Sequence, residues 1–179
     1  MIRVQVDSIR FSLLTQQRVV VLREINSRRY VPIWIGPFEA DAIALAVQGH
    51  EPPRPMTHDL LLAAITMLNS KIREVVVNDF HDSTFFAQIH LELNGQTLEL
   101  DSRSSDAIAL AVRADVPIFV AKHVMDELGH LMDEQDESDE LPTTTAQIEA
   151  EASPTKDDEE LSIFRKFIDS IEPDPAAEP

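Results

Sequence analysis

Alternating apolar and polar positions predict a β-rich beginning of the chain. Residues 2–11 alternate with the period of a half-buried strand. Residues 19–24 and 30–35 form two further apolar runs that are rich in β-branched side chains, which favour extended structure. The first 35 residues are therefore expected to form three consecutive strands.

Helical spacing follows directly after these strands. Gly36-Pro37 closes the third strand, and a proline suits the first turn of a helix, which we expect over residues 39–47. Three prolines between residues 52 and 55 exclude a helix there. Thr57 is the expected N-cap of a second helix that ends near residue 68.

The same order of patterns then occurs again. Strands are predicted over residues 72–80, 84–93 and 96–100, and Asn94-Gly95 is a strong hairpin signal between the last two. Ser102 or Ser104 is the expected cap of a helix through residues 106–112. A short strand, 116–120, and a last helix, 123–131, complete the pattern.

A repeated heptapeptide supports an internal duplication. Asp41–Val47 and Asp106–Val112 both read Asp-Ala-Ile-Ala-Leu-Ala-Val, and the same offset of 65 residues superposes the strands that precede them. We therefore predict an α+β fold in which internally duplicated β-β-β-α(-α) halves form one compact domain. The apolar face and the small alanines of the heptapeptide favour two central, heavily buried helices.

Charge divides the chain at about residue 131. Residues 1–131 carry 12 basic and 16 acidic side chains, whereas residues 132–179 carry 3 and 16, so most of the net charge of −17 falls on the second part. We expect a domain over 1–131 and an acidic, mostly disordered tail over 132–179. A short amphipathic helix is predicted near 158–171, which docks either on the chain's own domain or on a protein partner.

Composition narrows the chemistry further. The chain has no cysteine, which excludes disulfides, zinc–thiolate sites and cysteine nucleophiles. With four glycines it has no glycine-rich phosphate loop. The start of the chain has no signal peptide pattern, and no apolar run is long enough for a membrane span, so the expected compartment is the cytoplasm and no membrane partner is expected.

Three segments resemble the bifunctional nuclease family. Residues 33–44 read Ile-Trp-Ile-Gly-Pro-Phe-Glu-Ala-Asp-Ala-Ile-Ala, residues 54–60 read Arg-Pro-Met-Thr-His-Asp-Leu, and residues 101–113 contain the second heptapeptide. The family commonly has a proline where this chain has Ser104. The resemblance covers roughly residues 1–125. It implies a small α+β domain that forms a homo-oligomer and acts on nucleic acid, with both DNA and RNA as substrates in some members.

Carboxylates at the starts of the two repeated helices are candidate metal ligands. Phosphodiester hydrolysis needs an activated water and neutralised phosphate charge, which carboxylates supply by holding Mg²⁺ or Mn²⁺. Asp41 and Asp106 occupy equivalent positions, and Glu39 adds oxygens, so we predict a divalent metal at these three residues. The alternative is that carboxylates in a first helical turn only stabilise the helix dipole.

A second candidate site follows the prolines. Arg54 and Thr57 stand before a helix N-terminus, which suits an anion, and both are candidate substrate-binding residues together with Arg103. His58 and Asp59 are candidate acid–base residues, and with Asp106 they make up the predicted catalytic set. The alternative is a capped helix that carries a surface histidine and aspartate.

Three functions remain open from the sequence. The first is a metal-assisted nuclease acting on DNA or RNA. The second is a non-catalytic regulatory or scaffold module that binds protein or nucleic acid, which the lack of a basic stripe favours. The third is an anion sensor built on the Arg54 loop. Trp34 is expected in the core, and the acidic tail is expected to cover the binding surface, anchored by residues 161–171.

Overall fold

The computed structural model describes residues 1–11 and 17–131 of the chain. The predicted acidic tail, 132–179, and its amphipathic helix near 158–171 lie outside the described residues. Within the described part, no helix is both long enough and apolar enough to cross a membrane.

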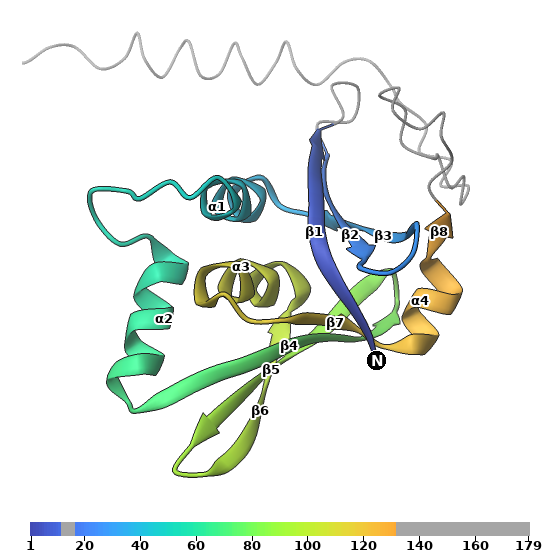
Figure 1. Ribbon diagram of the computed structural model, residues 1–179. Helices are drawn as coiled ribbons and strands as arrows, with labels where there is room; N and C mark the ends of the chain where they lie inside the picture. The colour runs from blue at the N-terminus through green and yellow to red at the C-terminus, as the bar shows by residue number, and fades with distance from the viewer. Residues whose placement is uncertain (12–16, 132–179) are drawn as a thin grey trace, which may run out of the picture. The chain divides into compact units, whose positions relative to one another are not determined.

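Eight strands in the described residues form one sheet (Figure 1). Its order is β6-β5-β4-β7-β1-β2-β3-β8, so two antiparallel meanders flank the short strand β7. β7 pairs parallel with β4 and antiparallel with β1. The strands are β1 (Ile2–Phe11), β2 (Arg18–Glu24), β3 (Arg29–Ile35), β4 (Ser70–His81), β5 (Thr84–Leu93), β6 (Gln96–Arg103), β7 (Ile118–Val120) and β8 (His130–Leu131).

Four helices accompany the sheet in the same part of the chain. They are α1 (Pro37–Val47), α2 (Thr57–Met67), α3 (Ser104–Ala114) and α4 (Lys122–Leu128). α1 and α3 are seen almost end-on and side by side in Figure 1, and they pack against each other. α3 also contacts α2, β4, β5 and β6, whereas α1 also packs against β2. α3 is therefore the central helix, and α1 and α2 lie on its flanks.

The predicted α+β fold and its element order are confirmed. Asn94 and Gly95 both have positive φ, 53° and 77°, as a tight hairpin turn of this kind requires. The last helix is shorter than predicted, because the chain leaves it at Gly129 and His130–Leu131 then pairs with Arg29 and Tyr30 as β8.

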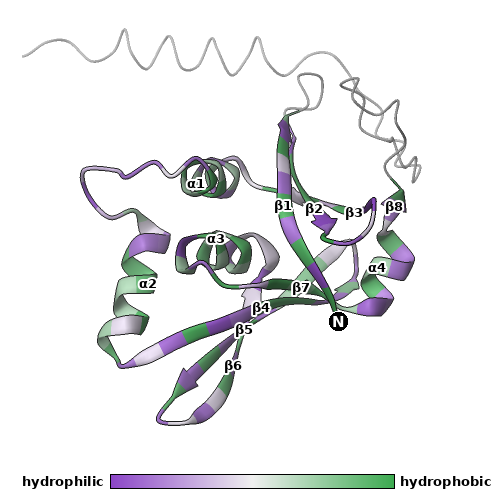
Figure 2. Ribbon diagram, in the orientation of Figure 1, coloured by the Kyte–Doolittle hydropathy of each residue, from purple (hydrophilic) through white to green (hydrophobic). Residues whose placement is uncertain are grey.

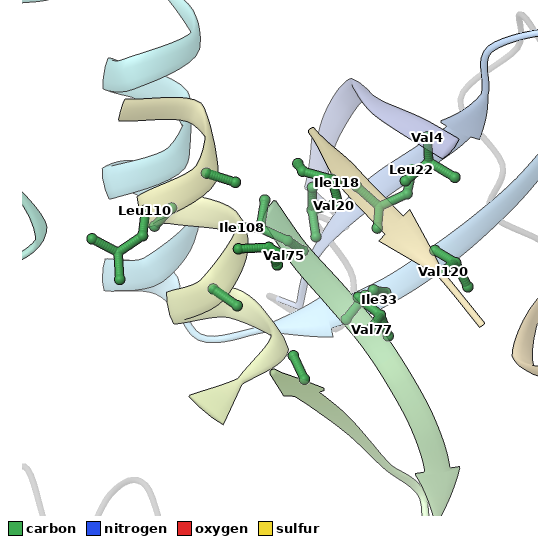
Figure 3. Packing of buried hydrophobic residues seen from close by; sticks show 14 of the residues in the cluster. Val4, Val20, Leu22, Ile33, Val75, Val77, Ile108, Leu110, Ile118 and Val120 are labelled. Atoms are coloured by element: carbon green, nitrogen blue, oxygen red, sulfur yellow. The ribbon is translucent and has the colours of Figure 1, made fainter. Parts of the chain in front are cut away.

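The core is formed by the apolar side of α3 and the strands beneath it. Figure 3 shows Ile108 of α3 beside Val75 of β4, with Val77 and residues of β1, β2, β3 and β7 close by, whereas Leu110 lies on the other side of α3. All these side chains are buried, and the alanines at 107, 109 and 111 are fully buried between them. Alanine has no bulk beyond its β-carbon, so neighbouring elements can approach α3 closely.

Several sequence expectations about burial are wrong. α1 is buried only along one side, and Val47 is half-exposed, because α1 packs mainly against α3 and β2, whereas α3 has two helices and three strands around it. Trp34 is also exposed rather than part of the core, because it alternates away from buried Ile33.

The predicted helix caps also differ from the structure. Met56, not Thr57, is the N-cap residue of α2, and the Asp59 carboxylate accepts the Met56 N–H at 2.8 Å. Arg103, rather than Ser102 or Ser104, is the N-cap residue of α3. In α2, the first-turn Asp59 thus takes the capping role that we expected from a hydroxyl group, whereas α3 has no side-chain cap hydrogen bond.

Candidate functional site

The start of α2 meets the start of α3 through a histidine–aspartate pair. His58 is the second residue of α2, and Asp106 is the third residue of α3. His58 Nε2 lies 3.0 Å from Asp106 Oδ1, which is hydrogen-bond distance. Only 10% of the His58 side chain is exposed, compared with 27% for Asp106. The pair is therefore set into the junction of two helices rather than free on the surface.

Arg103 joins this pair to α1. Its Nε donates to Asp106 Oδ2 at 2.6 Å, and its Nη2 donates to Asp106 Oδ1 at 3.0 Å. The same Nη2 lies 2.9 Å from Glu39 Oε1, in the first turn of α1. The Arg103 side chain is nevertheless 66% exposed. One guanidinium group thus binds two carboxylates from two helices and keeps a face open to solvent.

These contacts hold Asp106 in its charged form. Burial alone would raise the pKa of Asp106, but hydrogen bonds from Arg103 and His58 outweigh it and lower that pKa below its ordinary value. In turn, the hydrogen bond to Asp106 raises the pKa of Arg103. Both partners are therefore charged at neutral pH.

The charge on Asp106 determines which nitrogen of His58 carries the proton. An ionised carboxylate is only an acceptor, so the bond to Asp106 places a hydrogen on Nε2 and leaves the lone pair of neutral His58 on Nδ1. Nδ1 has no hydrogen-bond partner among the described residues. It is also not among the buried polar atoms that lack a partner there, so water can reach it. This arrangement can accept a proton at Nδ1.

A second ion pair fixes the position of α2. Arg113 Nε donates to Asp59 Oδ1 at 2.6 Å, and the Arg113 side chain is only 8% exposed. Its Nη1 donates to Ala109 O at 2.9 Å, and its Nη2 donates to Ala42 O at 3.0 Å. Arg113 therefore connects α1, α2 and α3 at one point.

Asp59 completes this clamp. Burial opposes its ionisation, but the backbone N–H of Met56 and the Arg113 guanidinium outweigh that effect and lower the pKa of Asp59. Both oxygens of the carboxylate already accept hydrogen bonds. Asp59 thus anchors the turn that presents its neighbour His58.

The remaining predicted residues lie apart from the histidine pair. The Asp41 carboxylate lies 3.2 Å from Arg18 Nη1, and its side chain is 64% exposed. Asp41 and Asp106 therefore have different partners rather than a shared one. Arg54 and Thr57 are exposed in and after the proline-rich loop. Within residues 1–11 and 17–131, no three histidine, aspartate or glutamate side chains are grouped closely enough to hold a metal ion.

Comparison with known proteins identifies the family. The model of the bifunctional nuclease domain matches residues 20–133, which is more than half of the 179-residue chain. The chain belongs to the bifunctional nuclease domain family. It is also similar to two uncharacterized proteins of Mycobacterium tuberculosis, Rv1829 and MT1877. Each is 41% identical over 171 residues, which is 96% of this chain and 95% of the relative.

The bifunctional nuclease domain contains every residue of the two ion-pair groups. Glu39, His58, Arg103 and Asp106 all fall inside the matched range, as does the Asp59–Arg113 clamp. Arg18, the partner of Asp41, lies just before it. Because the match spans nearly the whole described domain, it is the geometry alone that distinguishes the junction of α1, α2 and α3.

Sequence reasoning did not find the role of Arg113 in this bifunctional nuclease domain. The candidate residues did not include Arg113, whereas the structure pairs Arg113 with Asp59. One signal was present, since the first copy of the heptapeptide is followed by Gln48 and the second by Arg113. A charged residue in only one copy of a repeat indicates a contact made by that copy alone.

Proposed function

We propose that this bifunctional nuclease domain protein hydrolyses phosphodiester bonds of DNA or RNA, with His58 as general base and acid. The observation that supports this most strongly is the 3.0 Å contact of His58 Nε2 with an Asp106 carboxylate that Arg103 keeps ionised. An oriented imidazole with a free nitrogen is a common proton acceptor in enzymes. The family match supports a nuclease-related role.

Each side chain has a defined task in this proposal. Nδ1 of His58 takes a proton from the attacking hydroxyl or water, and Asp106 stabilises the imidazolium that forms. The exposed face of Arg103 approaches the phosphate, where a guanidinium matches the geometry of the oxygens. Asp59 positions α2 and does not exchange protons, because its two oxygens are already bonded.

The predicted divalent metal, Mg²⁺ or Mn²⁺, remains a proposal of its own. Glu39 and Asp106 are two of the three predicted ligands, and both bind Arg103, so a metal at these oxygens competes with a guanidinium. Asp41 has a separate partner in Arg18. Cleavage assays with EDTA, and with Mg²⁺ or Mn²⁺ restored, test this part independently of the histidine.

Substitution of the pair tests the central claim. We expect His58→Ala and Asp106→Asn each to lower the cleavage rate of single-stranded DNA and RNA by about 10²- to 10⁴-fold, since the first removes the general base and the second removes the charge that stabilises its imidazolium. His90→Ala is the matched control, because His90 Nδ1 lies 2.9 Å from Glu74 Oε1 and its side chain is 14% exposed. Activity that survives both substitutions in the purified protein would rule out this site.

The outer face of α2 supports a second property, self-association. Large apolar side chains at 60, 61, 67 and 68 are exposed there, and Figure 2 shows that most of this helix after its first turn is apolar. Exposed apolar patches of this kind mark contact surfaces. We propose that the chain forms a homo-oligomer through α2, although a regulatory or scaffold function with another protein would use the same face.

The oligomer is tested by its mass. The α2 variant Met67→Lys should lower the molar mass in light scattering toward that of one chain. Val47→Lys is the control, because Val47 is exposed on α1. A wild-type protein that is already monomeric would contradict self-association. The apolar face of α2 would then be assigned to contact with a different protein.

A further inference from the structure

A groove lies between α1 and the second half of β1. Its volume is about 360 Å³. Apolar side chains of both elements line it, namely Val6, Ile9 and Phe11 from β1 and Ala40, Ala44 and Val47 from α1. Two of them are largely exposed, Phe11 at 49% and Val47 at 52%. A concave surface with exposed apolar side chains is typical of a contact site for another molecule.

The repeat indicates what this face of α1 can bind. Asp41 and Gln48 also line the groove. The offset of 65 residues makes them equivalent to Asp106 and Arg113 of α3. Asp106 contacts His58, and Arg113 binds the aspartate that follows it, so both residues hold the first turn of α2. The positions that bind a helix in the second copy of the repeat therefore border an open groove in the first copy.

Asp41 lacks the second partner that its counterpart has. Asp106 binds Arg103 and also contacts a histidine of the helix that packs on α3. Asp41 binds Arg18, and it has no second ion-pair partner among the residues that the structure describes. A carboxylate has acceptor sites for more than one donor, and 64% of the Asp41 side chain is exposed. The groove thus has a carboxylate that can bind one more cation.

We propose that the groove binds the first turn of an amphipathic helix from a partner protein, and that a basic residue of this turn pairs with Asp41. This inference goes beyond the proposed function and does not depend on cleavage. The apolar stripe of such a helix covers Phe11 and Val47, which otherwise face water. The ion pair with Asp41 then selects helices that begin with a basic residue.

The described helices of a second copy do not provide this first turn. The first turn of α2 is already bound to α3, and those of α1 and α3 have an acidic residue and no basic one. In α4, Lys122 binds Asp126 of the same helix. His123 of α4 contacts Asp79 of β4. A helix from a different protein therefore fits the charge of the groove better than these four.

A synthetic helix tests the groove directly. The probe is a fluorescent peptide of about 14 residues, with leucines at helical spacing and an arginine in its first turn. A matched peptide has glutamate in place of the arginine. Both are titrated with the full-length protein, and binding is measured by fluorescence anisotropy. We expect the arginine peptide to bind about 3- to 30-fold more tightly, because an exposed ion pair with Asp41 replaces a repulsion.

Variants of exposed residues locate the bound peptide. Asp41→Lys should reverse the preference, so that the glutamate peptide binds more tightly. Val47→Lys should weaken the binding of both peptides by about 10- to 100-fold, because the valine side chain is no longer buried in the complex. Leu98→Lys is the control, since Leu98 is 43% exposed on β6, which β5, β4 and β7 separate from β1. It should leave both affinities unchanged.

Several results would overturn the inference. They are failure of both peptides to bind, an unchanged preference in Asp41→Lys, and equal weakening by Val47→Lys and Leu98→Lys. A lower molar mass of Val47→Lys in light scattering would assign the groove to a second copy instead. Binding that requires deletion of residues 132–179 would assign it to the chain itself. His58→Ala should leave peptide binding unchanged, so this test is independent of the cleavage test.

Discussion

Two helices with the same seven residues have different environments in this protein. In α3, the heptapeptide Asp106–Val112 is almost entirely buried, and its aspartate contacts His58 and Arg103. In α1, the heptapeptide Asp41–Val47 is buried only along the side that carries Ala42 and Ile43, and its aspartate contacts Arg18 near the surface. Identical sequence therefore produced one core helix and one flanking helix.

The difference arises from the neighbours of each helix. α3 is packed between α1 and α2 and also contacts three strands, whereas the described contacts of α1 are mainly with α3 and β2. The flanking residues differ as well, since Arg103 precedes α3 and Gly36 precedes α1. A local pattern specifies which face of a helix is apolar, but the number of partners depends on the rest of the fold.

The largest difference between the copies is expected for the central leucine. Leu45 and Leu110 are equivalent in the repeat, but Leu110 is fully buried and Leu45 is partly exposed. We expect Leu110→Ala to lower the free energy of unfolding by about 2–5 kcal/mol and Leu45→Ala by about 1 kcal/mol. Urea unfolding of both variants measures this, and equal losses would show that α1 is as central as α3.

The next effect concerns the residue after each heptapeptide. Arg113→Gln makes the second copy like the first and leaves Asp59 without its guanidinium partner. Because Asp59 is partly exposed, we expect a loss of about 2 kcal/mol in the free energy of unfolding, less than for a fully buried pair. The proposed cleavage activity should fall as well, since α2 loses its anchor. Gln48→Arg is the reciprocal control: Gln48 is exposed, so this change should alter neither the stability nor the activity. An Arg113→Gln variant as stable and as active as the wild type would exclude the clamp.

The smallest expected effect is a difference between Asp106 and Asp41 in how their contribution to the free energy of unfolding depends on pH. The pKa of Asp106 is lowered from 3.8 in the folded protein, so its ionised form stabilises the fold. This contribution is fully present above about pH 4 and is lost as the pH falls through the folded pKa. The stability difference between wild type and Asp106→Asn should therefore shrink in acid. Asp41→Asn removes an exposed pair and should cost at most about 1 kcal/mol. Urea unfolding between pH 3 and 7 distinguishes the two; a difference for Asp106→Asn that is constant with pH would contradict the linkage.

The sequence allowed most of the fold to be predicted but only part of the site. Strand alternation and the Asn94-Gly95 turn depend on residues close in the chain, and these predictions agree with the structure. The contact between His58 and Asp106 joins residues 48 positions apart, and it depends on how α2 packs on α3. Both residues were candidates, but no pattern in the sequence showed that they are in contact.

The three residues of β7 have a consequence for how the chain reaches this structure. Ile118 pairs with Val4 on one side and with Val75 on the other, and within the sheet no other described strand joins the two meanders. During synthesis both meanders leave the ribosome before this strand does, so each exposes an unpaired edge until then. The two halves are consequently joined late, by residues that are widely separated in the chain, which favours slow folding.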